Sequence, residues 1–551
     1  MASPSLRIIP LGGLGEIGRN MMLLEYADDI IIVDVGLMFP EEEMLGVDLV
    51  IPDFTYLREH RDNIRAVFLT HGHEDHVGAL PYFLREFNPP IYSARLTDGL
   101  IRVKLNEHRL LAKADLHVVK PGELIEAGIF TVEFFTVAHS IPDACGLIIR
   151  TPFGPVVHTG DFKLDHTPVM DQHTDLIRLG QIGAEGCLLL MADSTYAEVE
   201  GYTPTEQLVG EALRNVVVNA KGRVVIATFA SLISRIQQVV DAAVFCNRKV
   251  FVTGRSMIDN VAMARELGYL KIPPGTIIGV DEMRNISPAK LVIVTTGSQG
   301  EPTSALTKMA NGDHRHINIQ KGDTVVLSAN PIPGNEMAVS RNVDNLFRLG
   351  ADVMYNRVSN IHVRGHASRE ELKILQGLLQ PEYFVPIHGE YRMLVIHAKL
   401  AESVGVPEGN AFVLTDGDVL EINDQRAALA GRVSASYVYI DGLGIGDVDQ
   451  HILRDRAHLS TDGVVVVIAT VEKQTGHLTK AVEILSRGFV DVEEREELLE
   501  RSKQVAAKAM EGADHYAEFG DINLRIKDAI GKFLYDETRR RPMVLTVTVE
   551  V

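Results

Sequence analysis

One short block of the sequence carries the side chains best suited to chemistry. Four metal-binding residue types stand within six residues, directly after a short apolar stretch: His71, His73, Asp75 and His76. Residues two apart on an extended turn lie on the same side, so we expect His71 and His73 to share one cation. Asp75 and His76 are expected to open a helix and to face a second point. The block therefore predicts two neighbouring metal sites.

Three more residues of these types stand just beyond predicted β-strands: Asp34, His139 and Asp161. Functional groups that gather where the strands of one sheet end can form a site. Imidazole and carboxylate ligands without cysteine favour Zn²⁺, although Mn²⁺ and Mg²⁺ stay open. Two such ions, bridged by a carboxylate and a hydroxide, make water a nucleophile near neutral pH and hold a phosphodiester oxygen.

A glycine pattern near the N-terminus has the spacing of a dinucleotide-binding fingerprint but not its context. Glycines at 13, 15 and 18 form G-x-G-x-x-G, and Asp34 stands downstream, where a ribose-binding carboxylate could lie. That fingerprint requires a full helix after the glycines. The stretches 20–26 and 30–34 instead predict a β-hairpin, which argues against a nicotinamide cofactor. We expect Gly12–Gly18 to form a turn close to the active site.

The elements that must position these residues change character along the chain. Residues 6–194 predict a β-rich region with few helices, whereas 205–356 alternate between strand and helix, as in a parallel sheet covered by helices. A helix–strand–helix stretch follows at 370–403. The polar, glycine-bearing segment 423–446 predicts a linker. Residues 451–551 predict a small α+β domain.

Composition limits the classes of function. A chain of 551 residues, 46% hydrophobic and 23% charged, has enough apolar material for several cores. The net charge, 54 − 74 = −20, argues against coating nucleic acid or anionic membrane by bulk charge. The apolar runs are too short to span a membrane. Three scattered cysteines, Cys145, Cys187 and Cys246, predict a reducing, cytoplasmic setting.

The order of these motifs resembles known families. Asp34, the H-x-H-x-D-H block, His139 and Asp161 together resemble the metallo-β-lactamase superfamily. Later residues in the motifs ADST, GHAS and PIHGE resemble the additional motifs of β-CASP nucleases: Asp193, His366 and His388. With its C-terminal part included, essentially the whole chain resembles the bacterial ribonuclease J family.

This resemblance implies an α/β fold: a metallo-β-lactamase αββα sandwich, an inserted parallel-sheet β-CASP domain and a small α+β C-terminal domain. The sandwich is expected in two parts, and the expected ranges are 1–204 and 361–430 for the sandwich, 205–360 for the β-CASP domain, 431–450 for a linker and 451–551 for the C-terminal domain.

The resemblance also implies roles for the candidate residues. One metal would be held by His71, His73 and His139, the other by Asp75, His76 and His388, with Asp161 bridging the two. Asp34 would orient ligands from outside the metal shell. Asp193 and His366 would handle protons, one of them assisting the 3′-oxygen leaving group, and the sequence does not decide which.

Substrate binding is expected on segments that carry anion-binding groups. Backbone N–H groups at helix N-termini, together with an Arg, can bind phosphate locally despite the negative net charge. Phe229 is a candidate for base stacking. The predicted RNA-binding residues are Phe229, Ser231, His362, Arg364, Gly365 and Ser368. The segment 297–302 predicts simple helix capping instead.

The function that follows is a two-metal ribonuclease on single-stranded RNA, active from the 5′ end and also internally, in mRNA decay and rRNA maturation. The resemblance further implies a homodimer or homotetramer assembled through the C-terminal domain. The alternatives are a DNA-directed β-CASP nuclease, a small-ester or lactam hydrolase, and a non-catalytic subunit of an RNA-processing complex. The complete set of ligand-type residues argues against the last.

Overall fold

The computed structural model describes residues 5–41, 43–170, 172–332, 335–355, 361–472, 478–490, 492–511 and 519–551. It divides into two compact units, the first made of residues 1–39 and 49–438, the second of residues 40–48 and 439–551. Among the described helices, none combines the length and apolarity that crossing a membrane requires.

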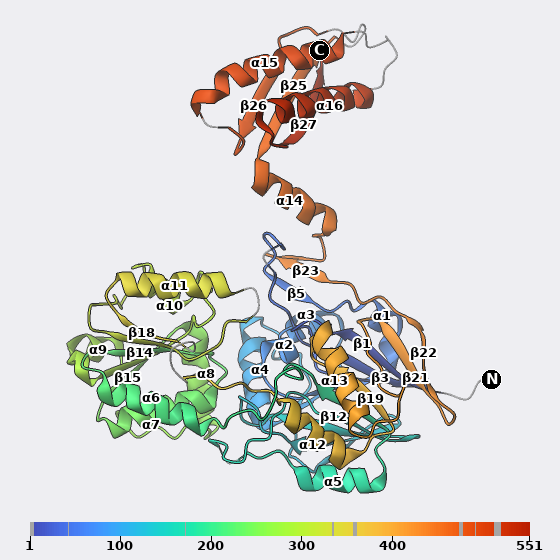
Figure 1. The fold of residues 1–551 in the computed structure, drawn as a ribbon, viewed down its shortest axis with the longest axis vertical. Helices are drawn as coiled ribbons and strands as arrows, with labels where there is room; N and C mark the ends of the chain where they lie inside the picture. Colours follow the sequence, from blue (N-terminus) through green and yellow to red (C-terminus); the bar gives the residue numbers. More distant parts are fainter. Residues whose placement is uncertain are drawn as a thin grey trace. The chain divides into compact units, whose positions relative to one another are not determined.

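Two β-sheets form the centre of the first unit (Figure 1). The larger has the order β22-β21-β1-β3-β4-β6-β7-β8. Its strands are Ala427–Arg432, Asp418–Ile422, Leu6–Gly12, Met21–Tyr26, Asp29–Val33, Ile64–Leu69, Ile91–Ser93 and Leu116–Val118. The smaller has the order β19-β13-β12-β11-β10-β9. Its strands are Tyr383–Ile387, Leu189–Asp193, Gly154–His158, Cys145–Thr151, Phe130–Thr136 and Leu124–Ala127.

The inner faces of the two sheets share one apolar core. Ile8 and Phe68 from the larger sheet are in the same buried cluster as Phe134 and Leu189 from the smaller. Helices supply the outer layers, so the αββα sandwich is confirmed. They are α1 (Thr55–Glu59), α2 (Glu74–Val77), α3 (Leu80–Glu86), α4 (Arg95–Glu107), α5 (Leu176–Glu185), α12 (Arg369–Leu379) and α13 (Tyr391–Ser403).

The structure corrects two predictions for this unit. The described part of residues 6–194 holds five α-helices rather than few. Helix α4 escaped notice because its buried positions include Thr97, Asp98 and Gly99, which break an apolar stripe. The segment 423–446 is not simply a linker, since β22 pairs with β21 at the edge of the larger sheet. Alanine, glycine and arginine in this exposed strand give no apolar alternation to reveal it.

The predicted β-hairpin after the N-terminal glycines is confirmed by the antiparallel pairing of β3 and β4. The glycine segment itself holds the short strand β2 (Leu14–Gly15), which pairs in parallel with β20 (Gly389–Glu390). Because β20 follows His388 directly, the glycine turn lies next to a predicted metal ligand.

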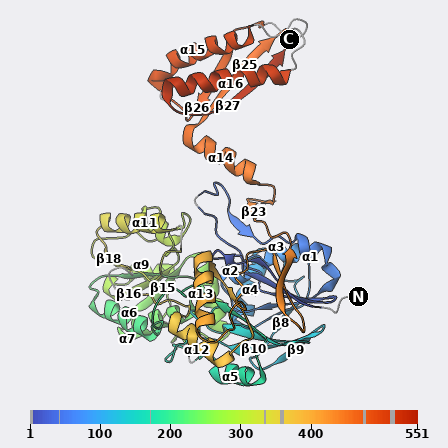
Figure 2. The same ribbon diagram turned by 45° about the vertical axis from the view of Figure 1, so that its right-hand side comes forward.

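A five-stranded parallel sheet forms the inserted domain and confirms the prediction from helix–strand alternation. Its order is β15-β16-β14-β17-β18. The strands are Lys249–Thr253, Leu291–Thr295, Val224–Ala227, Thr324–Leu327 and Asp352–Met354. Figure 2 shows helices on both faces. They are α6 (Gln207–Asn219), α7 (Ile233–Phe245), α8 (Arg255–Glu266), α9 (Val280–Asn285), α10 (Ala305–Ala310) and α11 (Glu336–Arg348).

Alternate residues of this sheet enter two different cores, as the two-residue period of a strand requires. Val224 and Ile226 pack in the cluster with α6 and α7, whereas Val225 and Ala227 pack with α10 and α11. Since both faces are buried, the strands read as continuous apolar runs in the sequence.

The second unit contains the α+β domain predicted after residue 451. Its sheet has the order β26-β25-β27, with strands Glu483–Arg487, Val464–Val471 and Met543–Glu550. Helices α15 (Val492–Met510) and α16 (Phe519–Thr538) pack on one face through a shared apolar core. The unit also includes the β23–β24 hairpin (Val438–Asp441, Gly444–Ile445) and helix α14 (Gln450–Asp462).

Candidate metal centre and RNA-facing surface

Three parallel strands of the smaller sheet bring functional residues to one edge. Strands β12, β13 and β19 run parallel, and Asp193 at the end of β13 pairs in register with Ile387 at the end of β19. Asp161 lies just beyond β12 and His388 just beyond β19. The carboxyl ends of parallel strands coincide, so residues far apart in sequence become neighbours here.

The larger sheet supplies the opposite side of the site in the same way. Strands β4 and β6 are parallel, and Val33 pairs with Phe68, so Asp34 after β4 lies beside the turn that carries His71. Asp34 has left-handed backbone, with φ 62°, as does His388, with φ 52°. Such conformations cost energy in residues other than glycine and occur where a side chain must leave a strand sharply.

The first group of ligand atoms comprises His71, His73, His139 and Asp161, each offering one atom within 4.8 Å of the others. His73 Nδ1 lies 3.0 Å from His71 Nε2 and 3.2 Å from His139 Nε2. Asp161 Oδ2 lies 3.5 Å from His71 Nε2. Ligand atoms around one tetrahedral zinc ion are about 3.3 Å apart, so this spacing suits a single ion.

The second group shares Asp161 with the first and adds Asp75, His76 and His388. His76 Nε2 lies 3.3 Å from Asp161 Oδ1 and 3.6 Å from Asp75 Oδ2. His388 Nε2 lies 3.5 Å from Asp161 Oδ2 and 3.8 Å from Asp75 Oδ2. One carboxylate therefore faces imidazoles from both groups, the arrangement that a bridging ligand needs.

A further shell of hydrogen bonds orients the ligands. Asp34 Oδ2 lies 2.7 Å from His76 Nδ1, and the same carboxylate accepts bonds of 2.8 Å from both the amide and the hydroxyl of Thr70. His139 Nδ1 donates to the carbonyl of Gly365 at 2.8 Å. A β-carbon on Gly365 would lie 2.7 Å from the His139 ring, so only glycine allows this approach. These partners fix the ring orientations.

The histidines of the first group bind protons weakly, and this favours metal coordination. Burial holds the pKa of His71 and His139 well below the usual value and lowers the pKa of His73 to about 4. The three imidazoles are therefore neutral near pH 7, the form that binds metal.

The carboxylate of Asp161, between the two groups, is held in its negatively charged form. Although burial opposes ionisation of Asp161, the histidines around it, His388 and His76 first, hold its pKa well below the usual range. The carboxylates Asp161, Asp75 and Asp34 raise the pKa of His76 well above its usual value against the effect of burial. The second group thus favours positive charge at its centre, as a site for a divalent cation does.

The residues present fit two divalent cations. Asp161 Oδ1 and His388 Nδ1 are buried without a hydrogen-bond partner among the described residues, although Asp161 is surrounded by imidazoles. A cavity of about 20 Å³ behind the ligands is lined by Asn20, Asp34 and His388, among others. That volume can hold one water molecule.

Asp193 and His366 form a pair beside this cluster. His366 Nδ1 lies 2.7 Å from Asp193 Oδ2 and 3.9 Å from Asp161 Oδ2. Burial lowers the pKa of His366, but Asp193 and Asp161 outweigh it and raise the pKa to about 9. The other oxygen of Asp193 accepts bonds from the amide and hydroxyl of Thr195. The pair can therefore carry a proton close to the metal ligands.

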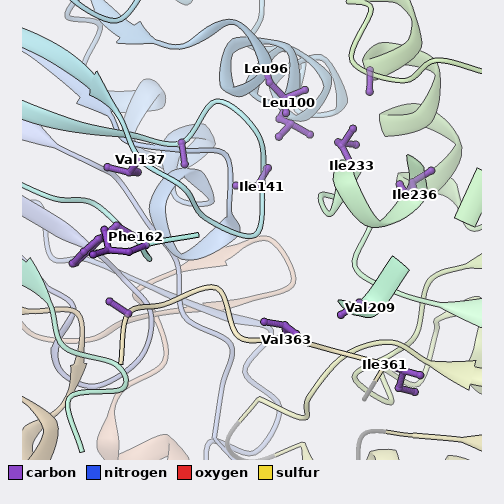
Figure 3. Packing of buried hydrophobic residues seen from close by; sticks show 14 of the residues in the cluster. Leu96, Leu100, Val137, Ile141, Phe162, Val209, Ile233, Ile236, Ile361 and Val363 are labelled. Atoms are coloured by element: carbon purple, nitrogen blue, oxygen red, sulfur yellow. The ribbon is translucent and has the colours of Figure 1, made fainter. Parts of the chain in front are cut away.

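The segment 361–367 presents alternate side chains to the site. Ile361 and Val363 are buried, whereas His362, Arg364 and His366 are only partly buried. This two-residue alternation is that of an extended chain. Figure 3 shows Ile361 and Val363 in an apolar cluster with residues of α4, α6 and α7. The cluster therefore anchors the segment between the sandwich and the inserted domain.

The predicted RNA-binding side chains occupy different environments. Burial, together with the nearby cations Arg235 and Lys163, lowers the pKa of His362 to about 3, so this side chain is neutral. Phe229 and Ser231 lie partly exposed between β14 and α7. Ser368 is fully buried.

The Ser368 side chain has hydrogen-bond partners within the protein. Its hydroxyl lies 2.8 Å from that of Thr203, and its side chain caps helix α12 together with Glu371. The Ser368 hydroxyl is thus already used by the protein.

Sequence reasoning overlooked Thr70 and Tyr196. Thr70 directly precedes the histidine block and binds Asp34 through two hydrogen bonds. The Tyr196 ring lies under the guanidinium of Arg364, with Cζ 4.7 Å from the ring centroid, and 5.9 Å from the His366 ring. Both residues stand close to predicted site residues in the sequence, which could have suggested a role. However, nothing in the sequence shows which way either side chain points.

Four family models match the chain. They are the metallo-beta-lactamase superfamily over residues 14–194, the ribonuclease J beta-CASP domain over 221–346, the RNA specificity domain of Zn-dependent metallo-hydrolases over 350–413, and the ribonuclease J C-terminal domain over 451–551. Together they cover most of the chain in the order that the motifs indicated.

Similar curated proteins extend over the full length. Ribonuclease J 1 of Streptococcus pyogenes is 43% identical over 98% of this chain and 97% of its own. Ribonuclease J2 of Bacillus subtilis is 42% identical over 99% of both chains, and Ribonuclease J of Thermus thermophilus is 44% identical over 99% and 95%. A protein of unknown function from Enterococcus faecalis shares the fold, with a TM-score of 0.55 at 18% identity, over 76% of this chain and 100% of its own.

Proposed function

The chain belongs to the ribonuclease J family, and we propose that it hydrolyses RNA phosphodiester bonds at a site for two Zn²⁺ ions. The observation that carries this proposal is the convergence of two ligand groups on the single carboxylate of Asp161. One group is rich in neutral imidazoles and the other contains two carboxylates, a donor set that suits divalent ions of the first transition series.

The reaction uses the chain's own residues on either side of the phosphate. Bound ions supply an activated water and polarise the phosphate oxygens. His366, protonated near neutral pH because its pKa is about 9, donates its proton to the departing 3′-oxygen. Asp193 holds the imidazolium in place. The P–O3′ bond breaks, which leaves a 3′-hydroxyl on the released nucleotide and a 5′-phosphate on the remaining RNA.

Recognition of the RNA 5′ end is assigned to the surface beside this pair. Arg364 is the fixed positive charge, since a planar guanidinium suits a terminal monophosphate. Ser231 and the neutral His362 add uncharged donors, and backbone groups around Gly365 and Ser368 complete the pocket. Phe229 is proposed to stack on a base. A terminal phosphate held there would place the first scissile bond beside Asp161 and His366, which would give 5′-to-3′ degradation. Internal cleavage needs no such contact.

The test compares matched single-stranded substrates with the metal-loaded full chain. RNAs with a 5′-monophosphate, 5′-triphosphate or 5′-hydroxyl, and a DNA of the same sequence, are digested and the product sizes resolved. We expect mononucleotides from the monophosphate RNA, longer internal fragments from the other RNAs, and little cleavage of DNA. A chelator should abolish all cleavage and Zn²⁺ should restore it. Preferential cleavage of DNA, or cleavage that resists chelation, would contradict the proposal.

Self-association is proposed to use the C-terminal sheet. The face of this sheet away from α15 and α16 exposes Leu485, Leu545, Val547 and Val549. An exposed apolar strand surface of this kind is a candidate interface. We expect light scattering to show that the full chain is a dimer or tetramer. The double variant Leu545→Lys, Val547→Lys should have a smaller molar mass, because the assembly dissociates. A Val218→Lys variant on exposed α6 is the control; unchanged assembly of the double variant would contradict this assignment.

The cellular setting follows from the same family membership. We propose that the protein acts in the cytoplasm, in mRNA decay and rRNA maturation. The three cysteines are free thiols in the structure, and two of them, Cys145 and Cys187, are buried, consistent with a reducing compartment.

A further inference from the structure

Tyr196 contacts the side chain to which 5′-end recognition is assigned. The guanidinium of Arg364 lies over the face of the Tyr196 ring, with Cζ 4.7 Å from its centroid. Cations lie within about 6 Å of an aromatic centroid when they are attracted to its face. Arginine side chains are long and adopt many rotamers in solution, so contact with a flat surface restricts where the guanidinium can be.

The Tyr196 ring is itself held in place. The residue lies three positions after Asp193, in a turn where the amide of Ala197 donates to Ser194 and that of Val199 donates to Tyr196. Its backbone also forms a parallel bridge with Ser368, beyond the segment that carries Arg364. The ring therefore connects two stretches of chain that both contribute to the site.

The same ring lies beside the proton-carrying pair. Its centroid is 5.9 Å from that of His366, with the planes tilted by 56°, and His366 is bound to Asp193 at 2.7 Å. The ring thus contacts the guanidinium of Arg364 and also lies near the proton-carrying pair. Contact with a rigid ring restricts how far the guanidinium can move relative to that pair.

We propose that Tyr196 is a positioning residue that holds the Arg364 guanidinium at a set distance from Asp193 and His366, and so places a 5′-terminal phosphate in register with the scissile bond. This proposal rests on the 5′-end role assigned to Arg364 above. Tyr196 acts through the face of its ring, so the hydroxyl is not required. Its effect should therefore appear on 5′-monophosphate RNA and disappear when Arg364 is absent.

The experiment measures kcat and KM for Tyr196→Leu and Tyr196→Phe, with metal-loaded enzyme, on matched 5′-monophosphate and 5′-hydroxyl RNAs. Tyr196→Leu should lower kcat/KM on the monophosphate RNA about three- to tenfold, chiefly through KM, and change the 5′-hydroxyl RNA less than twofold. Tyr196→Phe, which keeps the ring, should retain the wild-type preference. Tyr535→Leu is the matched control, because the Tyr535 ring also lies under a guanidinium, that of Arg541 with Cζ 4.5 Å from the centroid, but belongs to the second unit.

A double variant separates positioning from other roles. Tyr196→Leu should have no further effect in an Arg364→Ala background, because the ring then has nothing to position. An equal loss in that background, or an equal loss on both RNAs, would overturn the proposal, since the ring would then act on RNA or on the fold directly. If Arg364→Ala alone slows both RNAs equally, the 5′-end assignment fails instead, while the non-additivity still reports whether Tyr196 positions Arg364.

Discussion

The candidate metal ligands and the segment 361–367 are neighbours in space but are built in different ways. The seven candidate ligands lie just beyond strand ends, or on the turn and the short helix α2 that follow β6. His76 and His139 each have a second hydrogen-bond partner that orients the ring. Residues 361–367 lie in irregular chain, anchored by apolar contacts, and Arg364 is supported by one aromatic ring. Under the proposed function, two sheets fix the groups that do the chemistry, whereas the choice of RNA end depends on a few side chains.

The largest effect should follow loss of a metal ligand. We expect His76→Ala and His388→Ala each to reduce turnover of single-stranded RNA by about a hundredfold or more, because the second ion loses a ligand. RNA binding should be largely retained. Turnover and metal content are measured together, with His117→Ala on the exposed surface as control. Near-normal turnover of His76→Ala with full metal occupancy would contradict a two-metal site.

A smaller loss is expected when the support of a ligand is weakened but the ligand stays. Asp34→Asn should lower metal affinity or activity about ten- to a hundredfold, since the amide removes the charge that faces His76. Competition with a chelator gives the affinity, and Asp115→Asn, at an exposed carboxylate, is the control. If Asp34→Asn binds both ions as tightly as the wild type, the ring of His76 must be held by other contacts.

On the RNA-facing side the effect should depend on the substrate. Arg364→Ala should lower kcat/KM on 5′-monophosphate RNA about tenfold, or about 1.4 kcal/mol, through loss of charge-assisted hydrogen bonds. The same variant should act nearly normally on 5′-hydroxyl RNA. Arg102→Ala, at a partly exposed arginine paired with Asp98, controls for loss of charge. Equal slowing of both RNAs would make Arg364 a general backbone contact and weaken the contrast between the two regions.

The smallest effect on activity is expected at His362, whose protonation affects stability instead. Its pKa is about 3 in the folded protein, below about 6.5 in an unfolded chain. The unfolded state therefore binds more protons between these values, so the free energy of unfolding rises with pH across this window and is level above it. His362→Gln should flatten this rise by at most about 1.4 kcal/mol per pH unit.

Urea unfolding midpoints between pH 4.5 and 7.5 give the measurement for His362, with His117→Gln at a half-exposed imidazole as control. Because His362 stays neutral throughout this range, its contribution to RNA binding should not change between pH 6 and 8. The same acid dependence in the variant and the wild type would show that His362 is protonated in the folded protein.

Elements with a local sequence pattern could be predicted, whereas elements whose burial depends on distant parts of the chain could not. The parallel sheet of the inserted domain was predictable because strands such as Leu291–Thr295, buried on both faces, are continuous apolar runs. Strand β22 and helix α4 were missed, since β22 is exposed at a sheet edge and α4 buries Thr97 and Gly99. Side-chain burial at those places depends on elements distant in sequence, which no local pattern reports.

The residue types that can bind metal, and their places after strands, follow from the sequence, because those features depend on near neighbours along the chain. Tertiary packing is what brings Asp161 opposite imidazoles from both sheets, Gly365 against His139 and Arg364 onto Tyr196. These contacts join residues separated by dozens to hundreds of positions. Their geometry is set by strand order, register and packing between layers, which arise only when the chain folds as a whole.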